Sequence, residues 1–456
     1  MSKLLKMSRL PMQSNGDSCE PMELDVIIDA EERDELQVLD DVNLDLESHI
    51  SHYHGLNRIY RLDFIADHCR SLRVDALKLA LNYIKENTCN VKDYTRLFKK
   101  LQEASPASDG LLVPDTAWID TKTKQAALKT ERLENELKNF RINSMKENIR
   151  RAQDDLGDHY LDCGDLDNAY HAYTKSRDYV TTHRNQINQC LNIMRVSILS
   201  RRWSAVSNHA LRAESQPNND NPSVQTKLHC AAGLFELNSR RYKKAAKHFM
   251  TTSFDHFDTH FAILMPVNIA VYGSLCALAT FTRQELANQL INSTSFRQFA
   301  ELEPQMREAV SRFHESKYAL CLSILQEVKP ILLLDMHLAP HVERLYKAIR
   351  NKALVQYFEP YSSASLHKMA LAFNTNLDEL EKDIVKLIYD GQIRAKIDSY
   401  NKILFAKNTD PRSLTFEKAL KMGKTWQRNA RILISRTTIL SAGIEFDSAN
   451  ERCNSS

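Results

Sequence analysis

Glycine is scarce in this chain, with only 10 residues among 456. None is spaced as GxGxxG or GxxxxGK, the loops that bring backbone N–H groups against a nucleotide phosphate. The Gly-x-Ser-x-Gly turn that exposes the serine of many hydrolases is absent as well. These absences exclude the common nucleotide-binding and serine-hydrolase signatures. The runs of Leu, Ala, Lys and Glu between the glycines predict a mostly α protein.

The nine cysteines are too dispersed to form a CxxC pair, and the shortest spacing separates Cys69 from Cys89. This pattern is typical of reduced thiols inside a cell and not of a disulfide framework. Long apolar runs are missing too, since the run at 269–281 is shorter than the roughly 20 residues that cross a bilayer. The N-terminus lacks the apolar segment of a secretory signal. We therefore expect a cytoplasmic and nuclear protein with no membrane partner.

A large net charge is also lacking. The formal charge is +3, so bulk electrostatics indicates neither a nucleic acid nor a membrane as partner. The balance differs locally, because eleven acidic side chains between Asp17 and Asp41 are opposed by the single base Arg33. Few large apolar residues accompany them. Residues 1–43 are predicted to be an acidic disordered tail, and residues 443–456 a flexible one.

What the chain does contain is a recurring pattern of small and large residues with the spacing of a helical hairpin. The first copy comprises Gly157, Tyr160, Gly164, Ala169 and Tyr173. The same offsets recur from Met194, and from Gly233, where they give Ala245 and Phe249. A period near 37–39 residues is typical of tetratricopeptide-like arrays, in which each hairpin buries its apolar face against its neighbours. We predict such an array over residues 44–250, with one long helix at 118–149.

A different unit is predicted after Pro360. The sequence indicates a short helix at 366–373, then a helix from Asn376 to Asp390 that opens with a capping box between Asn376 and Glu379. Two strands follow at 392–398 and 402–406. Helix, helix and hairpin together predict a winged helix at about 361–408, within a domain spanning 251–411.

The last helix, predicted at 412–442, carries a heptad seam of apolar and small residues. The seam consists of Phe416, Ala419, Gly423, Trp426, Ala430, Leu433, Thr437 and Leu440. A narrow seam beyond the last compact unit predicts packing against partner helices. The basic residues of this helix then form the wetted side of a helical bundle. They are Lys418, Lys421, Lys424, Arg428, Arg431 and Arg436.

The histidine pairs lack complete metal-ligand sets. His52 and His54 resemble half of a zinc isopeptidase motif, but Leu62 and Ile65 stand where its serine and aspartate belong. The remaining pairs are also incomplete: His256 with His260, and His337 with His341. We expect no catalytic residue, no metal site and no cofactor.

A winged helix raises nucleic acid as a possible partner. The helix that would enter the groove, between Asn376 and Asp390, carries five acidic side chains and two basic ones. Phosphates would repel this charge, so nucleic acid is not expected as a partner. A freestanding winged-helix nucleic-acid binder remains the alternative from another functional class.

Helical repeats, a winged helix and a final bundle helix are the plan of PCI-domain subunits. Several segments resemble, more specifically, the subunit-one family of the COP-nine signalosome, which is related to a subunit of the proteasome lid. They are NSMKENIRRAQDDLGDHYLDCGDL (143–166), SLCALATFTRQEL (274–286), ELEPQ (301–305), LLLDMHLAPHV (332–342), AFNT (372–375) and TFEKALKMGK (415–424). The matching segments extend from about residue 44 to residue 428, which is most of the chain.

The resemblance implies a non-catalytic scaffold subunit of the complex that removes a ubiquitin-like modifier from cullins and so regulates cullin–RING ubiquitin ligases. The implied partners are these ligases and the other signalosome subunits, both the PCI subunits and the zinc isopeptidase subunits. The winged-helix edge, assigned here to Ile393, Ala395, Ile397 and Leu404, would join a ring of PCI domains. A scaffold subunit of the proteasome lid is the close alternative.

Overall fold

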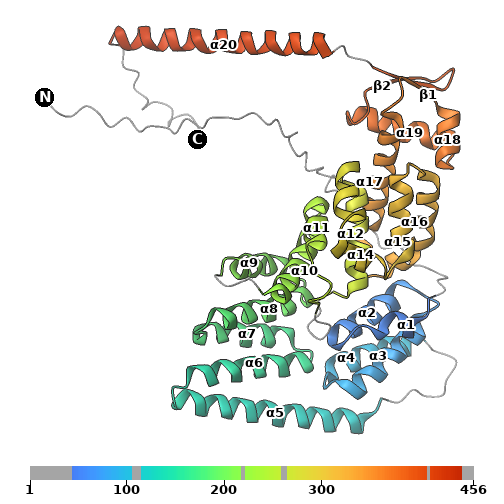
Figure 1. Cartoon of the computed structure of the whole chain (residues 1–456). Coiled ribbons are helices and arrows are strands. Elements are labelled where there is room, and N and C mark those ends of the chain that lie inside the picture. Colours follow the sequence, from blue (N-terminus) through green and yellow to red (C-terminus); the bar gives the residue numbers. More distant parts are fainter. Residues whose placement is uncertain (1–43, 105–113, 217–220, 258–263, 408–410, 444–456) are drawn as a thin grey trace, which may run out of the picture. The chain divides into compact units, whose positions relative to one another are not determined.

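The computed structural model describes residues 44–104, 114–216, 221–257, 264–407 and 411–443 (Figure 1). The predicted acidic tail and nearly all of the predicted C-terminal tail lie outside these residues. The chain divides into two compact units, and the boundary between Lys352 and Ala353 falls inside helix α17 (Ala339–Phe358). The described part is mostly helical with one small sheet, which confirms the predicted fold class. None of its helices is long and apolar enough to cross a membrane.

Four helices open the first unit: α1 (Leu46–Ser51), α2 (Gly55–His68), α3 (Arg73–Asn87) and α4 (Val91–Ala104). Their apolar residues recur at steps of three and four, and in α2 this places Ile59, Leu62 and Ile65 in the interior. The resulting core cluster also takes in Tyr173 and Leu334 from much later in the chain. The N-terminal helices therefore share one interior with the rest of the first unit.

The repeat array follows as antiparallel helical hairpins that lie side by side in Figure 1. Its helices are α5 (Thr116–Ile142), α6 (Lys146–Asp162), α7 (Leu166–Ser176), η1 (Arg177–Tyr179), α8 (His183–Leu199), α9 (Trp203–Glu214), α10 (Pro222–Asn238) and α11 (Tyr242–Met250). Within two of the hairpins the helices pack closely at a glycine. A Cβ on Gly157 would lie 2.6 Å from the ring of Tyr173, and one on Gly233 would lie 2.5 Å from the ring of Phe249.

The other repeat-packing residues divide between the interior and the partly exposed surface of the hairpins. Ala169 and Ala245 are fully buried, and Tyr160 is half-buried. Gly164 occupies the turn between α6 and α7.

Three of the hairpins turn through one residue with a left-handed backbone, namely Gly164 (φ +74°), Arg201 (φ +56°) and Arg240 (φ +62°). In each turn the next amide bonds a carbonyl five residues earlier, as from Asp165 N to Tyr160 O at 2.9 Å. This bond satisfies one of the free carbonyls at the helix end. The period in the sequence is therefore the period of these turns.

The single helix predicted at 118–149 is wrong, because the chain forms α5 and α6 there instead. Ser144 adopts φ +53°, and the Met145 amide bonds the Phe140 carbonyl at 3.2 Å. This is the same turn that joins the later hairpins. The sequence concealed it because serine stands where glycine or asparagine would have signalled the left-handed residue.

The first unit ends in a second group of helices. They are α12 (Pro266–Thr280), α13 (Arg283–Glu285), the π-helical η2 (Leu286–Ile291), α14 (Thr294–Ala300), α15 (Pro304–His314), α16 (Tyr318–Leu333) and the first part of α17. Helix α12 is buried continuously from Asn268 to Leu278, so the apolar run at 269–281 is a core helix. A capping box between Thr282 and Glu285 starts the next turn of the chain.

The second unit contains a winged helix. Its elements are β1 (Ser363–Ser365), α18 (Leu366–Phe373), α19 (Leu377–Tyr389), β2 (Ala395–Asp398) and β3 (Ile403–Ala406), and its strands are antiparallel in the order β1–β3–β2. Strand β1 was not predicted, because a Ser-Ala-Ser segment has no alternating apolar pattern. The first hairpin strand begins at Ala395, three residues later than predicted.

The predicted capping box of α19 is also wrong. Asn376 is the N-cap residue, but its side chain makes no capping hydrogen bond. The start of the helix is set instead by the preceding turn, in which Asn374 has φ +49° and the Thr375 amide bonds the Ala370 carbonyl at 3.1 Å.

Candidate protein-interaction sites

Helix α20 (Pro411–Ser441) exposes large apolar side chains along its length. Phe416 is 65% exposed, Trp426 74%, Leu433 61% and Leu440 77%. Ala419 and Gly423 are exposed and Ala430 is half-buried. Burying one such side chain contributes roughly 1.5–3 kcal/mol, so this face favours association with another apolar surface.

The apolar face of α20 is wider than the predicted seam. Leu420, Met422 and Ile434, which flank the seam, are exposed as well, from 49% for Leu420 to 70% for Met422. A two-stranded coiled coil needs only the narrow seam, whereas a helix packed among several others needs a broader stripe. The exposed face therefore fits a multi-helix bundle. The basic side chains of this helix are also exposed.

The assignment of four residues to an exposed winged-helix edge needs correction. Ile393, Ala395 and Leu404 are 4%, 8% and 0% exposed, and Ile397 is half-buried. These side chains form the interior beneath the sheet, because the inward face of each strand packs on the helices. What β2 presents outward is its unpaired backbone edge, since its only neighbour in the described sheet is β3.

The remaining surface of the winged helix combines acidic and aromatic groups. Glu381 of α19 accepts hydrogen bonds from Lys402 Nζ at 2.7 Å and Ser399 Oγ at 3.0 Å, which ties the helix to the hairpin. These bonds lower the pKa of the Glu381 carboxyl. Tyr389 and Tyr400 are almost fully exposed, as is common at protein interfaces.

A buried ion pair, missed by the sequence analysis, joins α2 to the segment before α17. Arg61 Nη1 lies 2.8 Å from Asp335 Oδ2, and Tyr272 donates a hydrogen bond to Asp335 Oδ1 at 2.6 Å. Burial raises the pKa of Asp335, but Arg61 outweighs this effect and holds the pKa well below its usual range. No local pattern could reveal a pair whose members lie 274 residues apart.

Of the histidines singled out in the sequence, His337 and His341 pack against aromatic rings, whereas His52 and His54 are exposed and His260 lies outside the described residues. The ring of His337 meets that of Trp203 edge to face, with centroids 6.4 Å apart, and His341 Nδ1 lies 3.3 Å from the hydroxyl of Tyr242. Burial lowers the pKa of His337 to about 4, and Arg61 adds to this shift. Within the described residues, no three His, Cys, Asp or Glu side chains gather as a metal site.

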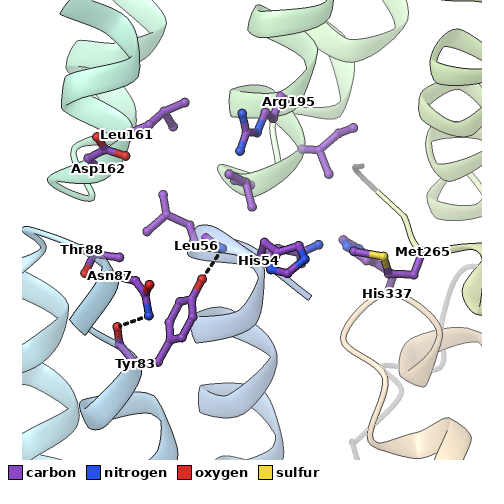
Figure 2. A pocket seen from close by; sticks show the side chains of 14 residues that line it. His54, Leu56, Tyr83, Asn87, Thr88, Leu161, Asp162, Arg195, Met265 and His337 are labelled. Carbon is purple, nitrogen blue, oxygen red and sulfur yellow. Dashed lines mark hydrogen bonds between the residues drawn. The ribbon is translucent and has the colours of Figure 1, made fainter. Parts of the chain in front are cut away.

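A cavity of about 110 Å³ lies between the N-terminal helices and the repeat array. Figure 2 shows His54, His337 and Met265 along one side, Arg195 above them, and Thr88 and Asp162 at the opposite side. The hydroxyl of Tyr83 accepts a hydrogen bond from the Gly55 amide at 2.8 Å, which fixes the start of α2 at the cavity wall. Its lining carries both charges and apolar groups, and it indicates no single ligand chemistry.

Comparison with known families agrees with this architecture. The model of 26S proteasome subunit RPN7 matches residues 115–289, that of the PCI domain matches residues 325–408, and that of the C-terminal helix of COP9 signalosome complex subunit 1 matches residues 412–437. Repeats, winged helix and these matches define a PCI-domain protein.

Curated relatives specify the family further. COP9 signalosome complex subunit 1b of Drosophila melanogaster is 44% identical, over 96% of this chain and 93% of the relative. COP9 signalosome complex subunit 1 of Arabidopsis thaliana is 40% identical, over 87% of this chain and 90% of the relative. The subunit 1 of Emericella nidulans is 34% identical, over 88% of this chain and 83% of the relative. The chain belongs to the COP9 signalosome complex subunit 1 family.

Proposed function

We propose that the chain is a non-catalytic scaffold subunit of a COP9 signalosome and enters that complex through α20. The observation that carries this proposal is the broad exposed apolar face of α20. These side chains would gain the free energy of burial only when another chain covers them. The family membership supports the same assignment. The proteasome-lid alternative is less well supported, because the RPN7 match ends at residue 289 whereas the signalosome relatives match most of the chain.

The assembly step is tested by Trp426→Asp and Leu433→Asp in the full chain. Either carboxylate would be buried without a partner in the bundle, at a cost of several kcal/mol. Both variants should be lost from the complex when the other signalosome subunits are affinity-purified, while circular dichroism shows the helical content of the wild type.

Ser435→Asp is the matched control, because Ser435 is exposed and lies off the seam of the same helix. It adds the same charge and should co-purify normally. Normal assembly of both Trp426→Asp and Leu433→Asp would disprove the role of α20. Co-purification of proteasome lid and base subunits in place of isopeptidase subunits would favour the proteasome-lid alternative.

In the finer form of the proposal, the complex removes a ubiquitin-like modifier from cullins and so regulates cullin–RING ligases in the cytoplasm and nucleus. This chain then supplies architecture, while a zinc isopeptidase subunit supplies catalysis. Adding the chain to the remaining subunits should restore cullin processing, and the chain alone should process none. Turnover by the purified chain would refute the non-catalytic assignment, and imaging of a fluorescent fusion tests the compartment.

A further inference from the structure

Two of the described cysteines differ from the rest. Cys69, Cys190, Cys230, Cys276 and Cys321 are buried, whereas Cys89 and Cys163 are partly exposed. Cys89 follows α3 and Cys163 follows α6, so 74 residues separate them in the sequence. A reagent in solvent therefore reaches these two thiols before the buried five.

The two partly exposed cysteines are also neighbours in space. The Cys89 amide donates a hydrogen bond to the carbonyl of Asp162, the residue before Cys163, at 3.3 Å. With standard backbone dimensions, this contact places the two Cα atoms on the order of 5–7 Å apart. Cysteines joined by a disulfide have Cα atoms roughly 4.4–6.8 Å apart. The next residues interlock as well, since a Cβ on Gly164 would lie 2.1 Å from the side chain of Asn90.

His159 stands beside Cys163, one helical turn earlier, with Sγ 3.9 Å from Nδ1 and 3.8 Å from Nε2 of the ring. Nε2 of the same ring lies 3.2 Å from the carbonyl oxygen of Ala126 and 3.0 Å from Thr130 Oγ1. The carbonyl can only accept, so Nε2 carries the proton and Nδ1 keeps its lone pair. Burial lowers the pKa of His159, which keeps the ring neutral near pH 7. Nδ1 is thus available to accept a proton from the Cys163 thiol.

We propose that Cys89 and Cys163 are a redox pair that hydrogen peroxide converts into a reversible disulfide between the turns after α3 and α6. Sγ of Cys89 attacks one peroxide oxygen, so an S–O bond forms, the O–O bond breaks and water leaves with the thiol proton. Sγ of Cys163 then attacks the Cys89 sulfur. The S–S bond forms, the S–O bond breaks, and a second water leaves with the proton that passes through His159. Two thiols are oxidised and one peroxide is reduced to two waters.

The order of the two steps follows from the surroundings of Cys163. Burial raises the pKa of its thiol to about 11, and nearby Cys89 and Asp162 add to this shift. The thiolate is the form that reacts with peroxide, so the raised pKa makes Cys163 a poor first nucleophile and suits it to the resolving step. Thr88 and Asp162, the residues directly before the two cysteines, both line the cavity of Figure 2. The disulfide would therefore join the two turns that line one side of this cavity.

The test uses the full-length chain, reduced, diluted and treated with hydrogen peroxide. Peptide mapping without reductant should find the Cys89 and Cys163 peptides linked, with the mass of two hydrogen atoms lost, and dithiothreitol should release them. In Cys163→Ser, Cys89 should accumulate as a sulfenic acid that dimedone traps. His159→Gln should slow linkage by roughly tenfold or more while sulfenic acid still forms at Cys89.

Three outcomes would overturn the proposal. Both thiols could stay open to alkylation while Cys19 and Cys453, the cysteines outside the described residues, oxidise. The linked peptides could join other cysteines. The linkage could appear only as a dimer whose yield rises with protein concentration. Thermal melts monitored by circular dichroism verify that Cys89→Ser and Cys163→Ser fold as the wild type does.

Discussion

At the scale of single residues, the helical glycines of this chain have two opposite environments. Gly157 and Gly233 are held against aromatic rings, whereas a Cβ on Gly423 of α20 would meet nothing within 4 Å. The sequence could indicate the first two, because their spacing to Tyr173 and Phe249 is the same. It could not reveal that Gly423 lies in the open, because a heptad position looks alike whether its partner helix is present or absent.

Gly157→Ala is therefore expected to destabilise the first unit. The new methyl group would overlap the ring of Tyr173, which cannot move freely because its hydroxyl bonds the carboxylate of Asp158. Overpacking of this kind costs typically about 1–3 kcal/mol, partly offset by about 1 kcal/mol from the better helix propensity of alanine. Urea denaturation should show a lower free energy of unfolding for Gly157→Ala than for the wild type. Gly423→Ala should show no such decrease. Equal stability of Gly157→Ala and the wild type would contradict the close contact.

At the scale of elements, the helices were more predictable than the positions where they end. Amphipathic periods located α18, α19 and the last helix, because a helix that buries one face carries apolar residues at steps of three and four. Left-handed turns were readable where the repeat period placed them, so those at Gly164, Arg201 and Arg240 were located, whereas Ser144 lies outside the recognised repeats and was missed. The buried positions Ile393 and Leu404 were assigned to an edge because alternation shows that a strand has two faces without showing which one is covered.

The width of the apolar face of α20 also has a consequence at this scale. Ile434 lies beside the seam position Leu433 and is 62% exposed. In a multi-helix bundle it would be covered, whereas in a two-stranded coiled coil it would stay at the margin. We expect Ile434→Asp to remove the chain from its complex almost as fully as Leu433→Asp does, in the same co-purification assay. Retention equal to that of Ser435→Asp would instead indicate a narrow contact.

At the scale of the whole molecule, the cluster around Arg61 links the beginning of the first unit to its end. Arg61 Cζ lies 4.2 Å from the centroid of the Tyr53 ring, and the hydroxyl of Tyr53 donates to Asn268 at 2.8 Å. Buried charges of this kind contribute little net stability, but removing one partner is costly because the other is left buried and unpaired. The pairing thus specifies which segments meet.

This cluster predicts an acid-sensitive stability. His337 has a pKa of about 4 in the folded chain, below its ordinary value of 6.5, with Arg61, Arg201, Asp335 and His341 around it. The unfolded state binds the proton more tightly, so unfolding becomes easier as the pH falls from about 6.5 toward 4. The Asp335 carboxyl adds to this loss of stability only at lower pH. Its lowered pKa stabilises the folded state at neutral pH, and this stabilisation is lost only when the pH falls far enough to protonate the carboxyl.

Urea denaturation at pH 7, 6 and 5 measures this effect. The wild type should lose on the order of 1–2 kcal/mol more than His337→Gln over this range. Other buried histidines act in both proteins and cancel in the comparison. Parallel pH profiles for the two proteins would show that His337 is not the sensitive group.

The pairing of Arg61 with Asp335 also sets an order of events during synthesis. A ribosome makes the arginine long before the aspartate, and domains tend to form from the N-terminus as the chain emerges. Until residue 335 has left the exit tunnel, the first four helices hold a cation that has no counter-ion and must keep it in water. A truncated chain that ends before residue 335 would lack this counter-ion and could not complete the core of the first unit. We expect such a fragment to be bound by chaperones and degraded by proteases.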